Sequence, residues 1–247
     1  MIKKLRLLIR ENKFFRQTIY GPIRWVFNDV YGYRRRLLQR YGAGALKKVM
    51  DASSSSGLAV IPAFGTLLGL VRDRGFMKHD DDMDFVILPR EAGDLKTFFR
   101  WLVQQGFYFE WMETINGFLT EVRFRYHEVP VDFFLHGRTA DGKQLMMIQK
   151  DTSTRRYEYP MVDELVDYAV AGCVAKIPAN YDEYLTSLYG SWNQVVKSGW
   201  SSTMAPCCKG ETDASKYDII STRDEAVLWK WLQGHSQFVR FEEYGHV

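Results

Sequence analysis

The sequence has few cysteines and no long apolar run. Only three of its 247 residues are cysteine, Cys173, Cys207 and Cys208, too few for a disulfide framework. Its apolar stretches are a few residues long, whereas a helix that spans a bilayer needs about 20. The N-terminal apolar run at residues 7–9 is also shorter than the core of a secretory signal, which takes about 7 to 15 residues. These absences predict a cytoplasmic protein without a transmembrane segment.

The net charge of +3 conceals a strongly basic N-terminal segment. Residues 1–40 contain eleven Lys or Arg against Glu11 and Asp29, a balance of +9, which leaves −6 for the rest of the chain. Apolar residues, partly at helical spacing, interleave with these charges, as in a helix that lies at an anionic membrane surface. The alternative is a solvated helix packed on the protein body. Nucleic-acid binding is not expected, because no recognised binding motif accompanies the charge.

Apolar residues recur at helix spacing in some segments and form short strand-like runs in others, which predicts an α+β protein. A hydrophobic fraction of 46% allows one domain, with or without an appendage, to bury a substantial core. A stretch rich in Gly, Ser, Thr and Pro at residues 198–215 predicts a surface loop. We expect helices at residues 41–57, 67–72, 90–105, 181–189 and 226–233, and strands at 58–64, 85–88, 107–111, 118–125 and 129–135.

Four aspartates stand within five positions, immediately before an apolar run. Asp80, Asp81, Asp82 and Asp84 lead into residues 85–88. Their mutual repulsion beside an apolar strand is costly unless a cation compensates for it. Because side chains alternate along a strand, Asp82 and Asp84 share one face. Together they can bind a hard divalent cation through oxygen.

Three interpretations of the acidic run differ in what they require of its neighbours. A calcium-binding helix-loop-helix hand needs glycine at its sixth position, where Phe85 stands. A solvated acidic loop would not need to enter an apolar strand. The third interpretation is a Mg²⁺ or Mn²⁺ site for phosphoryl chemistry. Asp132 would complete it, because it is a lone acid in the apolar run 129–135 and buried charges are paired or bind metal.

The region from Gly65-Thr66 to Asp132 resembles known phosphoryl-transfer proteins. A Gly-Thr turn, a short helix, two acids on the next strand and a third acid on a later strand resemble the nucleotidyltransferase fold shared with DNA polymerase beta. The longer string at residues 63–84, AFGTLLGLVRDRGFMKHDDDMD, resembles the LicD family of phosphotransferases, related to fukutin and fukutin-related protein. His79 replaces the tryptophan that is usual in the family. The similarity extends over much of residues 41–195.

The resemblance implies transfer of a phospho-alcohol, such as phosphocholine or a polyol phosphate, from a CDP-linked donor. The acceptor would be a hydroxyl of a cell-surface glycan or of its lipid-linked precursor. Asp82 and Asp84 would hold Mg²⁺ or Mn²⁺ on the diphosphate of the donor. Asp132 would complete the metal site or accept the proton of the acceptor. Asp80 would be a further metal contact or a supporting residue.

Three more residues are expected at the phosphates of the donor. Gly65 suits close approach of the backbone, and the hydroxyl of Thr66 can donate to a phosphate oxygen. Arg72 offers planar donors to the same group. Two alternatives stay open. One is a nucleotidyltransferase that moves NMP from an NTP and releases pyrophosphate, and the other is a non-catalytic protein that binds a nucleotide or a glycan.

The expected organisation is a basic amphipathic segment at residues 1–40 followed by a catalytic domain at 41–247. The core of that domain would lie at 41–136, and its C-terminal part, 137–247, would be mainly helical and loop. The basic segment could rest on the inner face of the cell membrane, near a lipid-linked acceptor. The cysteines make a poor zinc site, because Cys207 and Cys208 are adjacent and lack the usual spacing.

Overall fold

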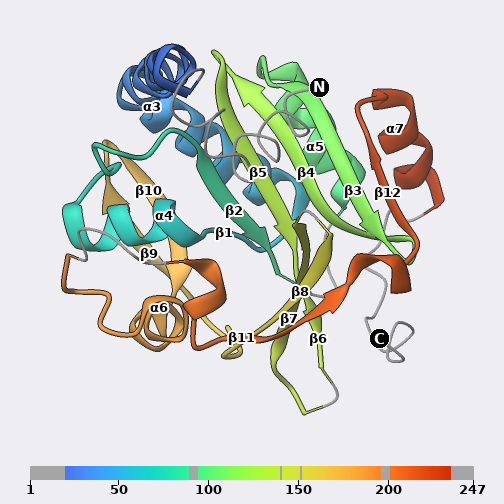
Figure 1. Cartoon of the computed structure of the whole chain (residues 1–247). Coiled ribbons are helices and arrows are strands. Elements are labelled where there is room, and N and C mark those ends of the chain that lie inside the picture. Colours follow the sequence, from blue (N-terminus) through green and yellow to red (C-terminus); the bar gives the residue numbers. More distant parts are fainter. Residues whose placement is uncertain (1–19, 89–93, 140, 151, 196–200, 235–247) are drawn as a thin grey trace.

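A mixed six-stranded sheet in the order β1-β2-β5-β4-β3-β12 forms the centre of the protein (Figure 1). The computed structural model describes residues 20–88, 94–139, 141–150, 152–195 and 201–234, with the backbone alone at 20–29. Strands β2 and β5 are parallel, and the other neighbouring pairs are antiparallel. The predicted α+β class is therefore confirmed. The strands are β1 (Val60–Pro62), β2 (Met83–Ile87), β3 (Tyr108–Ile115), β4 (Phe118–Tyr126), β5 (Val129–Leu135) and β12 (Ile219–Thr222).

One face of the central sheet carries a core of aromatic side chains. Phe85 on β2 stacks on Phe133 of β5, with ring centroids 5.5 Å apart. Phe98 meets Phe133 edge-on at 5.3 Å, and Phe99 stacks on Phe124 of β4 at 5.5 Å. All five side chains are fully buried. Because side chains alternate, the residues between these phenylalanines point to the opposite face of the sheet, where the acids lie.

Helices pack on the aromatic face and at its edges. Gly57, with a φ of 71°, follows the last residue of the longest helix, as its position at the end of the apolar pattern predicts. The carboxylate of Asp94 accepts hydrogen bonds from the backbone N–H groups of Lys96 and Thr97, so the next helix begins at Leu95. That helix was expected from residue 90, but 89–93 lie outside the described residues. The helices are α3 (Tyr20–Ser56), α5 (Leu95–Gln104) and α7 (Glu225–Gly234).

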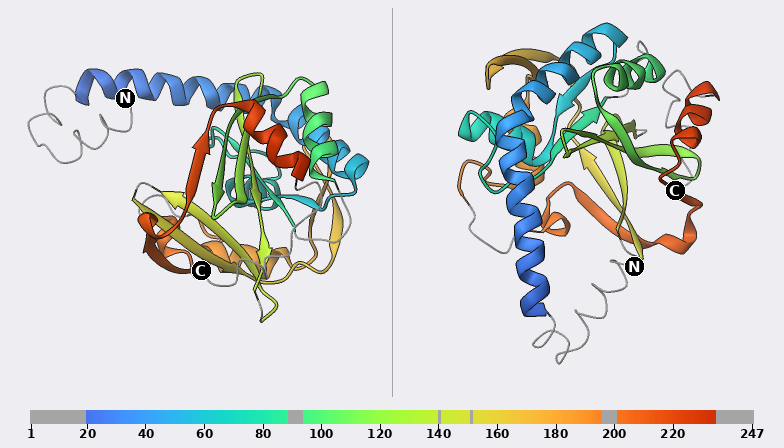
Figure 2. Two further views of the ribbon diagram at one scale, coloured as in Figure 1. Left: turned by 90° about the vertical axis from the view of Figure 1, so that its right-hand side faces the viewer. Right: turned by 90° about the horizontal axis from the view of Figure 1, so that it is seen from above.

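Helix α3 is 37 residues long and passes residue 40 without a break. Its first turns extend beyond the rest of the molecule (Figure 2). The amide of Gln39 anchors the middle of the helix by donating to the carbonyl oxygens of Phe76 and Met77, both at 3.3 Å. No helix within the described residues is long and apolar enough to cross a membrane. Residues 1–19 of the basic segment lie outside the described part of the chain.

The C-terminal part is richer in strands than the sequence predicts. A second sheet in the order β11-β8-β7-β6 lies over the acid-bearing face of the central sheet (Figure 2), and β9 pairs with β10 in a separate hairpin. The prediction of a mainly helical and loop region at 137–247 is wrong, as is the loop at 198–215, which contains β11. These elements are β6 (Gly137–Arg138), β7 (Gln144–Lys150), β8 (Ser153–Tyr159), β9 (Leu165–Val170), β10 (Cys173–Pro178), α6 (Tyr181–Tyr189) and β11 (Cys208–Asp213).

The second sheet was not predicted, because its strands are polar and some of them pair with strands far away in the sequence. β8 reads STRRYEY and β11 reads CKGETD, without the apolar alternation that marks a half-buried strand. Thr212 of β11 lies opposite Thr154 of β8, a pairing that no local pattern indicates. By contrast, α6 has the predicted bounds, Tyr181–Tyr189, and Gly190 follows it.

Candidate active site

The parallel register of β2 and β5 brings two of the predicted aspartates together. Asp84 lies directly opposite Asp132, and Asp82 precedes Asp84 by two residues on the same face. One carboxylate oxygen from each of the three lies within 4.8 Å of the other two. Asp132 is only 1% exposed, while Asp82 and Asp84 are half-buried. Among the described residues this is the only cluster of at least three acidic, histidine or cysteine side chains with metal-ligand spacing.

Burial and repulsion make the ionised form of this triad unfavourable. Burial, followed by the charges of Asp132 and its other acidic neighbours, raises the pKa of Asp82 to about 7. The same two causes, with Asp82 as the main neighbour, raise the pKa of Asp84 well above its usual value. Burial also raises the pKa of Asp132. A cation bound between the three oxygens would reverse this penalty, and hard divalent cations prefer carboxylate oxygen.

Arg123 on β4 faces the triad from the neighbouring strand, directly opposite Asp132. Its Nη2 donates to Oδ2 of Asp132 at 2.6 Å, and its Nε donates to Oδ1. The guanidinium carbon also lies 5.6 Å from the ring centroid of Trp111. Both oxygens of Asp132 therefore accept from one planar group, which fixes the orientation of this carboxylate. Arg123 was not predicted, since its pairing with Asp132 depends on the strand register.

Glu121 lies on the same face of β4, two residues before Arg123. The side chain is buried, with 7% exposed. Burial, and then the charge of Asp132, raises its pKa well above the usual value. Across the ladder it faces Glu113 of β3, which is also buried. Two charged residues, Glu121 and Arg123, stand two positions apart in a largely apolar strand. This pattern is the sequence feature that could have indicated them.

The Gly65-Thr66 pair lies in a short helix, α4 (Phe64–Leu68), and not in the predicted turn. The helix continues as one π-helical turn, η1 (Gly69–Asp73). Oγ1 of Thr66, a residue 1% exposed, accepts the backbone N–H of Asp84 at 2.9 Å. The N–H of Ala63 donates to the carbonyl oxygen of the same aspartate, also at 2.9 Å. The start of α4 therefore holds Asp84 in place through both its backbone N–H and its backbone carbonyl oxygen.

Gly65 makes room for a fourth acid. A Cβ at this position would stand 2.7 Å from Oδ2 of Asp80, closer than real contacts allow. Burial raises the pKa of Asp80 to about 6, so this carboxyl group belongs to the same desolvated acidic site. Asp81 instead points toward α3, where its Oδ2 lies 3.8 Å from Nη1 of Arg34. The roles of Gly65 and Thr66 toward a phosphate stay predictions, and the structure adds their contacts with the aspartates.

A family model described as LicD/FKTN/FKRP, nucleotidyltransferase domain, matches residues 57–180, about half of the chain. The protein belongs to the LicD family. The matched segment contains the triad, Arg123 and the α4 contacts, and it ends just before α6. Membership supports a phosphotransferase or glycan-modifying transferase, and with it the nucleotidyltransferase type of fold. No curated protein gives a significant match.

A cavity of about 260 Å³ adjoins the acidic site of this LicD-family protein. It is bounded by Arg72, His79, Tyr189 and Trp192, among others. The side chain of Tyr189 is near the acids, since burial and then the charges of Asp84 and Asp80 raise its pKa. His79, the residue that replaces the usual tryptophan, thus lines the wall of a cavity beside the aspartates.

Arg72 forms its ion pair with Asp73 and not with an acid of the triad. Its Nε and Nη2 donate to the carboxylate of Asp73 at 2.8 and 3.0 Å, and Nη2 also lies 3.2 Å from Sδ of Met77. The hydrogen bonds to Asp73 raise the pKa of the arginine further. The structure therefore places Arg72 in the cavity wall, where its charge is partly compensated.

The three cysteines take no part in this LicD-family site. Cys173, Cys207 and Cys208 are free, and Cys207 is buried. None of them belongs to a potential metal-ligating group within the described ranges. The thiol of Cys173 donates to the carbonyl oxygen of Val170 at 3.5 Å, a contact within the β9–β10 hairpin.

Proposed function

We propose that this protein transfers a phospho-alcohol, such as phosphocholine or a polyol phosphate, from a CDP-linked donor to a glycan. The hydroxyl acceptor would belong to a cell-surface glycan, for example of a lipopolysaccharide, capsule or teichoic acid, or to its lipid-linked precursor. The observation that carries the proposal is the carboxylate triad, whose oxygens lie within 4.8 Å of one another beside a cavity of about 260 Å³. Membership of the LicD family supports the same class of reaction.

Asp82, Asp84 and Asp132 fit Mg²⁺ or Mn²⁺, because all three present carboxylate oxygens and their ionisation is unfavourable without a cation. Such an ion supplies charge stabilisation at phosphoryl oxygens. Asp80 lies close enough to act as a supporting acid. Of the two roles expected for Asp132, holding the metal is favoured over accepting a proton, since the two hydrogen bonds from Arg123 stabilise the ionised carboxylate and each oxygen keeps a lone pair for the ion.

Glu121 is the better candidate for the proton acceptor. It is buried on the face of the sheet that carries the triad, and burial raises its pKa, which makes it a stronger base than an exposed glutamate. The cavity next to α4 would take the donor. There Arg72 offers donors to a phosphate, and Tyr189 and Trp192 offer aromatic surface to the base or the alcohol.

We place the reaction at the inner face of the cell membrane. The strongly basic N-terminal segment supports this location, because each lysine or arginine near an anionic surface contributes about 1 kcal/mol. Deletion of residues 1–40 would test it directly. We expect the shortened protein to bind less to vesicles with 30 mol% phosphatidylglycerol, and unchanged binding would remove the membrane assignment. Because α3 anchors the 76–81 segment through Gln39 and Arg34, charge reversal at residues 3, 4, 6 and 10 is the milder variant.

The reaction is tested by incubating the protein with a panel of CDP-alcohols and Mg²⁺. Phospho-alcohol transfer breaks the diphosphate on the β side and releases CMP. Nucleotidyl transfer, the alternative in the same fold, would instead release pyrophosphate from CTP. A protein that binds CDP-alcohols but releases neither product with any glycan acceptor would be a binding protein. Asp84→Asn is the negative control, and full turnover by this variant would contradict the role of the triad.

A further inference from the structure

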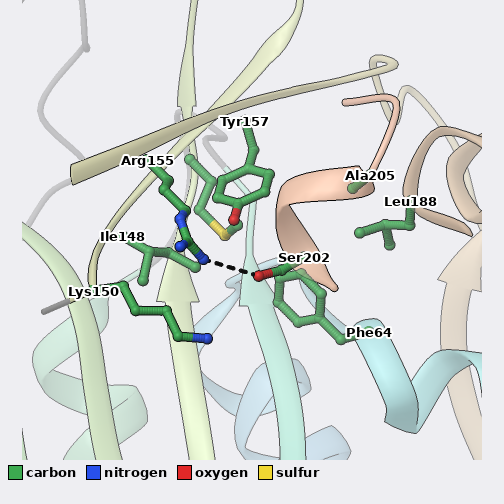
Figure 3. Close-up of a pocket in the computed structure, with 9 residues that line it drawn as sticks. Phe64, Ile148, Lys150, Arg155, Tyr157, Leu188, Ser202 and Ala205 are labelled. Atoms are coloured by element: carbon green, nitrogen blue, oxygen red, sulfur yellow. Dashed lines mark hydrogen bonds between the residues drawn. The ribbon is translucent and has the colours of Figure 1, made fainter. Parts of the chain in front are cut away.

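A second cavity, of about 100 Å³, lies between the β7–β8 hairpin and the start of α4. Two basic side chains line it, Lys150 from β7 and Arg155 from β8 (Figure 3). Ile148 lies opposite Arg155, and Lys150 lies opposite Ser153, so both basic residues point to the same face of the hairpin. The geometry points to an anion subsite here, and we propose that it binds a phosphate group carried by the acceptor.

The charges of the cavity support an anionic occupant. Nε of Arg155 is 2.9 Å from Oε1 of Glu211, and its Nη1 donates to Oγ of Ser202 at 3.2 Å. These contacts hold the guanidinium group in position, with 14% of the side chain exposed. No carboxylate among the described residues forms an ion pair with Lys150. After Glu211 is counted against Arg155, one uncompensated positive charge remains beside a pre-oriented arginine and a hydroxyl group.

The cavity lies next to the acidic site, on the opposite end of α4 from the larger cavity. Phe64, the first residue of α4, lines it. The ring of Phe64 meets that of Phe134 edge-on at 5.2 Å, and Phe134 follows Asp132 by two residues on the same face of β5. The larger cavity is lined by Leu68, at the other end of the helix. The two cavities thus flank α4, one for the donor and one for the acceptor.

An acceptor that carries a phosphate needs such a subsite because the acids around the triad repel anions. β7, which carries Lys150, lies over this acidic surface, since the N–H of Gln149 is 3.3 Å from Oε1 of Glu113. Lys150 and Arg155 would offset that repulsion locally. A phosphorylated polyol unit and a lipid-linked sugar phosphate both present this chemistry. This inference deepens the proposed function, and it rests on that function for the identity of the occupant as acceptor.

Phosphate binding can be measured without any turnover. Inorganic phosphate and glucose 1-phosphate are titrated against the full chain in EDTA and followed by ³¹P relaxation, with wild type, Lys150→Met and Lys143→Met compared. Lys143 is a matched control, because it is an exposed lysine immediately before β7 that already pairs with Asp141. We expect Lys150→Met to weaken binding roughly tenfold, the loss typical of one charge-assisted contact, and Lys143→Met to change nothing. Absence of binding by wild type, or equal binding by Lys150→Met, would overturn the subsite.

Kinetics then distinguish the acceptor role from simple anion binding. Once an active CDP-alcohol donor is found, Lys150→Met should raise KM roughly tenfold for an acceptor with a phosphate next to the reacting hydroxyl. The rate at which the donor is hydrolysed to CMP should not change. The KM for the same acceptor without its phosphate should not change either. An equal effect on both acceptors would contradict the assignment. If wild type releases no CMP from any donor, the proposed function fails, while phosphate binding in EDTA still decides the subsite.

Discussion

Replacing Asp82 by asparagine should raise the stability of the metal-free protein while it removes metal binding. In the unfolded chain this carboxyl group ionises near its ordinary pKa of 3.8, whereas in the folded protein its pKa is about 7. Between these pH values the folded state therefore binds more protons than the unfolded state, so stability falls as the pH rises. Above pH 7 the full free-energy cost of ionising Asp82 in the folded protein is present. The uncharged amide of asparagine avoids this cost.

The size of the effect follows from the shift in pKa. A difference of about 3 units, at 1.36 kcal/mol each, corresponds to at most about 4 kcal/mol. Part of it is shared with the neighbouring acids, so we expect Asp82→Asn to gain about 2–4 kcal/mol at pH 8 in EDTA. For a domain of this size, each kcal/mol raises Tm by roughly 2–4 °C. At pH 4 the gain should nearly vanish, because Asp82 is then uncharged in folded wild type and only partly ionised in the unfolded chain.

Thermal unfolding at pH 4 and pH 8, with EDTA or 10 mM Mg²⁺, measures this prediction. Wild type should gain several degrees from Mg²⁺ at pH 8 and little at pH 4, since the carboxylates must lose protons to bind it. Asp82→Asn should gain almost nothing from Mg²⁺ at either pH. Asp167→Asn is the matched control, an exposed acid paired with Lys176 on the β9–β10 hairpin. A variant that is less stable than wild type in EDTA at pH 8 would contradict the raised pKa of Asp82, and one that keeps the Mg²⁺ effect would contradict its role as a metal ligand.

Three further substitutions test individual contacts. Thr66→Val should cost about 1–3 kcal/mol in chemical unfolding, because the N–H of Asp84 loses its buried acceptor, whereas Thr66→Ser should be nearly neutral. Gly65→Ala should lower kcat by displacing the carboxylate of Asp80, but it should have no additional effect in an Asp80→Ala background, and an additive loss would contradict the contact. Glu121→Gln should lower kcat by about 10²–10⁴ with Mg²⁺ affinity unchanged, and a variant with normal kcat would exclude Glu121 as the proton acceptor.

The triad was predictable because its signals are local. Asp82 and Asp84 interrupt the start of an apolar strand at a spacing of two, and Asp132 stands alone in a second apolar run. An acid in such a position needs a partner, and this requirement can be read without knowing the fold. Their approach within 4.8 Å follows once the two strands are neighbours.

Arg123, Glu121 and the second cavity were not predictable, because they depend on pairing between distant segments. The register of β4 against β5 decides that Arg123 meets Asp132 and not a neighbouring residue. In the sequence, Lys150 and Arg155 cannot be distinguished from ordinary surface charges. Only the position of the polar β7–β8 hairpin over the acidic face brings them to the second cavity. The short helix at Gly65 was also misjudged, because the glycine suggested a turn, whereas its function in the structure is to leave space for Asp80.

In the proposed reaction, Asp82, Asp84 and Asp132 would hold a divalent cation at the diphosphate of the donor. This role can be measured by electron paramagnetic resonance of Mn²⁺ bound to the protein, with ³¹P electron–nuclear double resonance after a CDP-alcohol is added. Wild type should bind Mn²⁺ and show a ³¹P coupling with the donor, and Asp84→Asn should show neither. A wild-type protein that binds no Mn²⁺, or bound Mn²⁺ that shows the same ³¹P coupling in Asp84→Asn, would contradict this role.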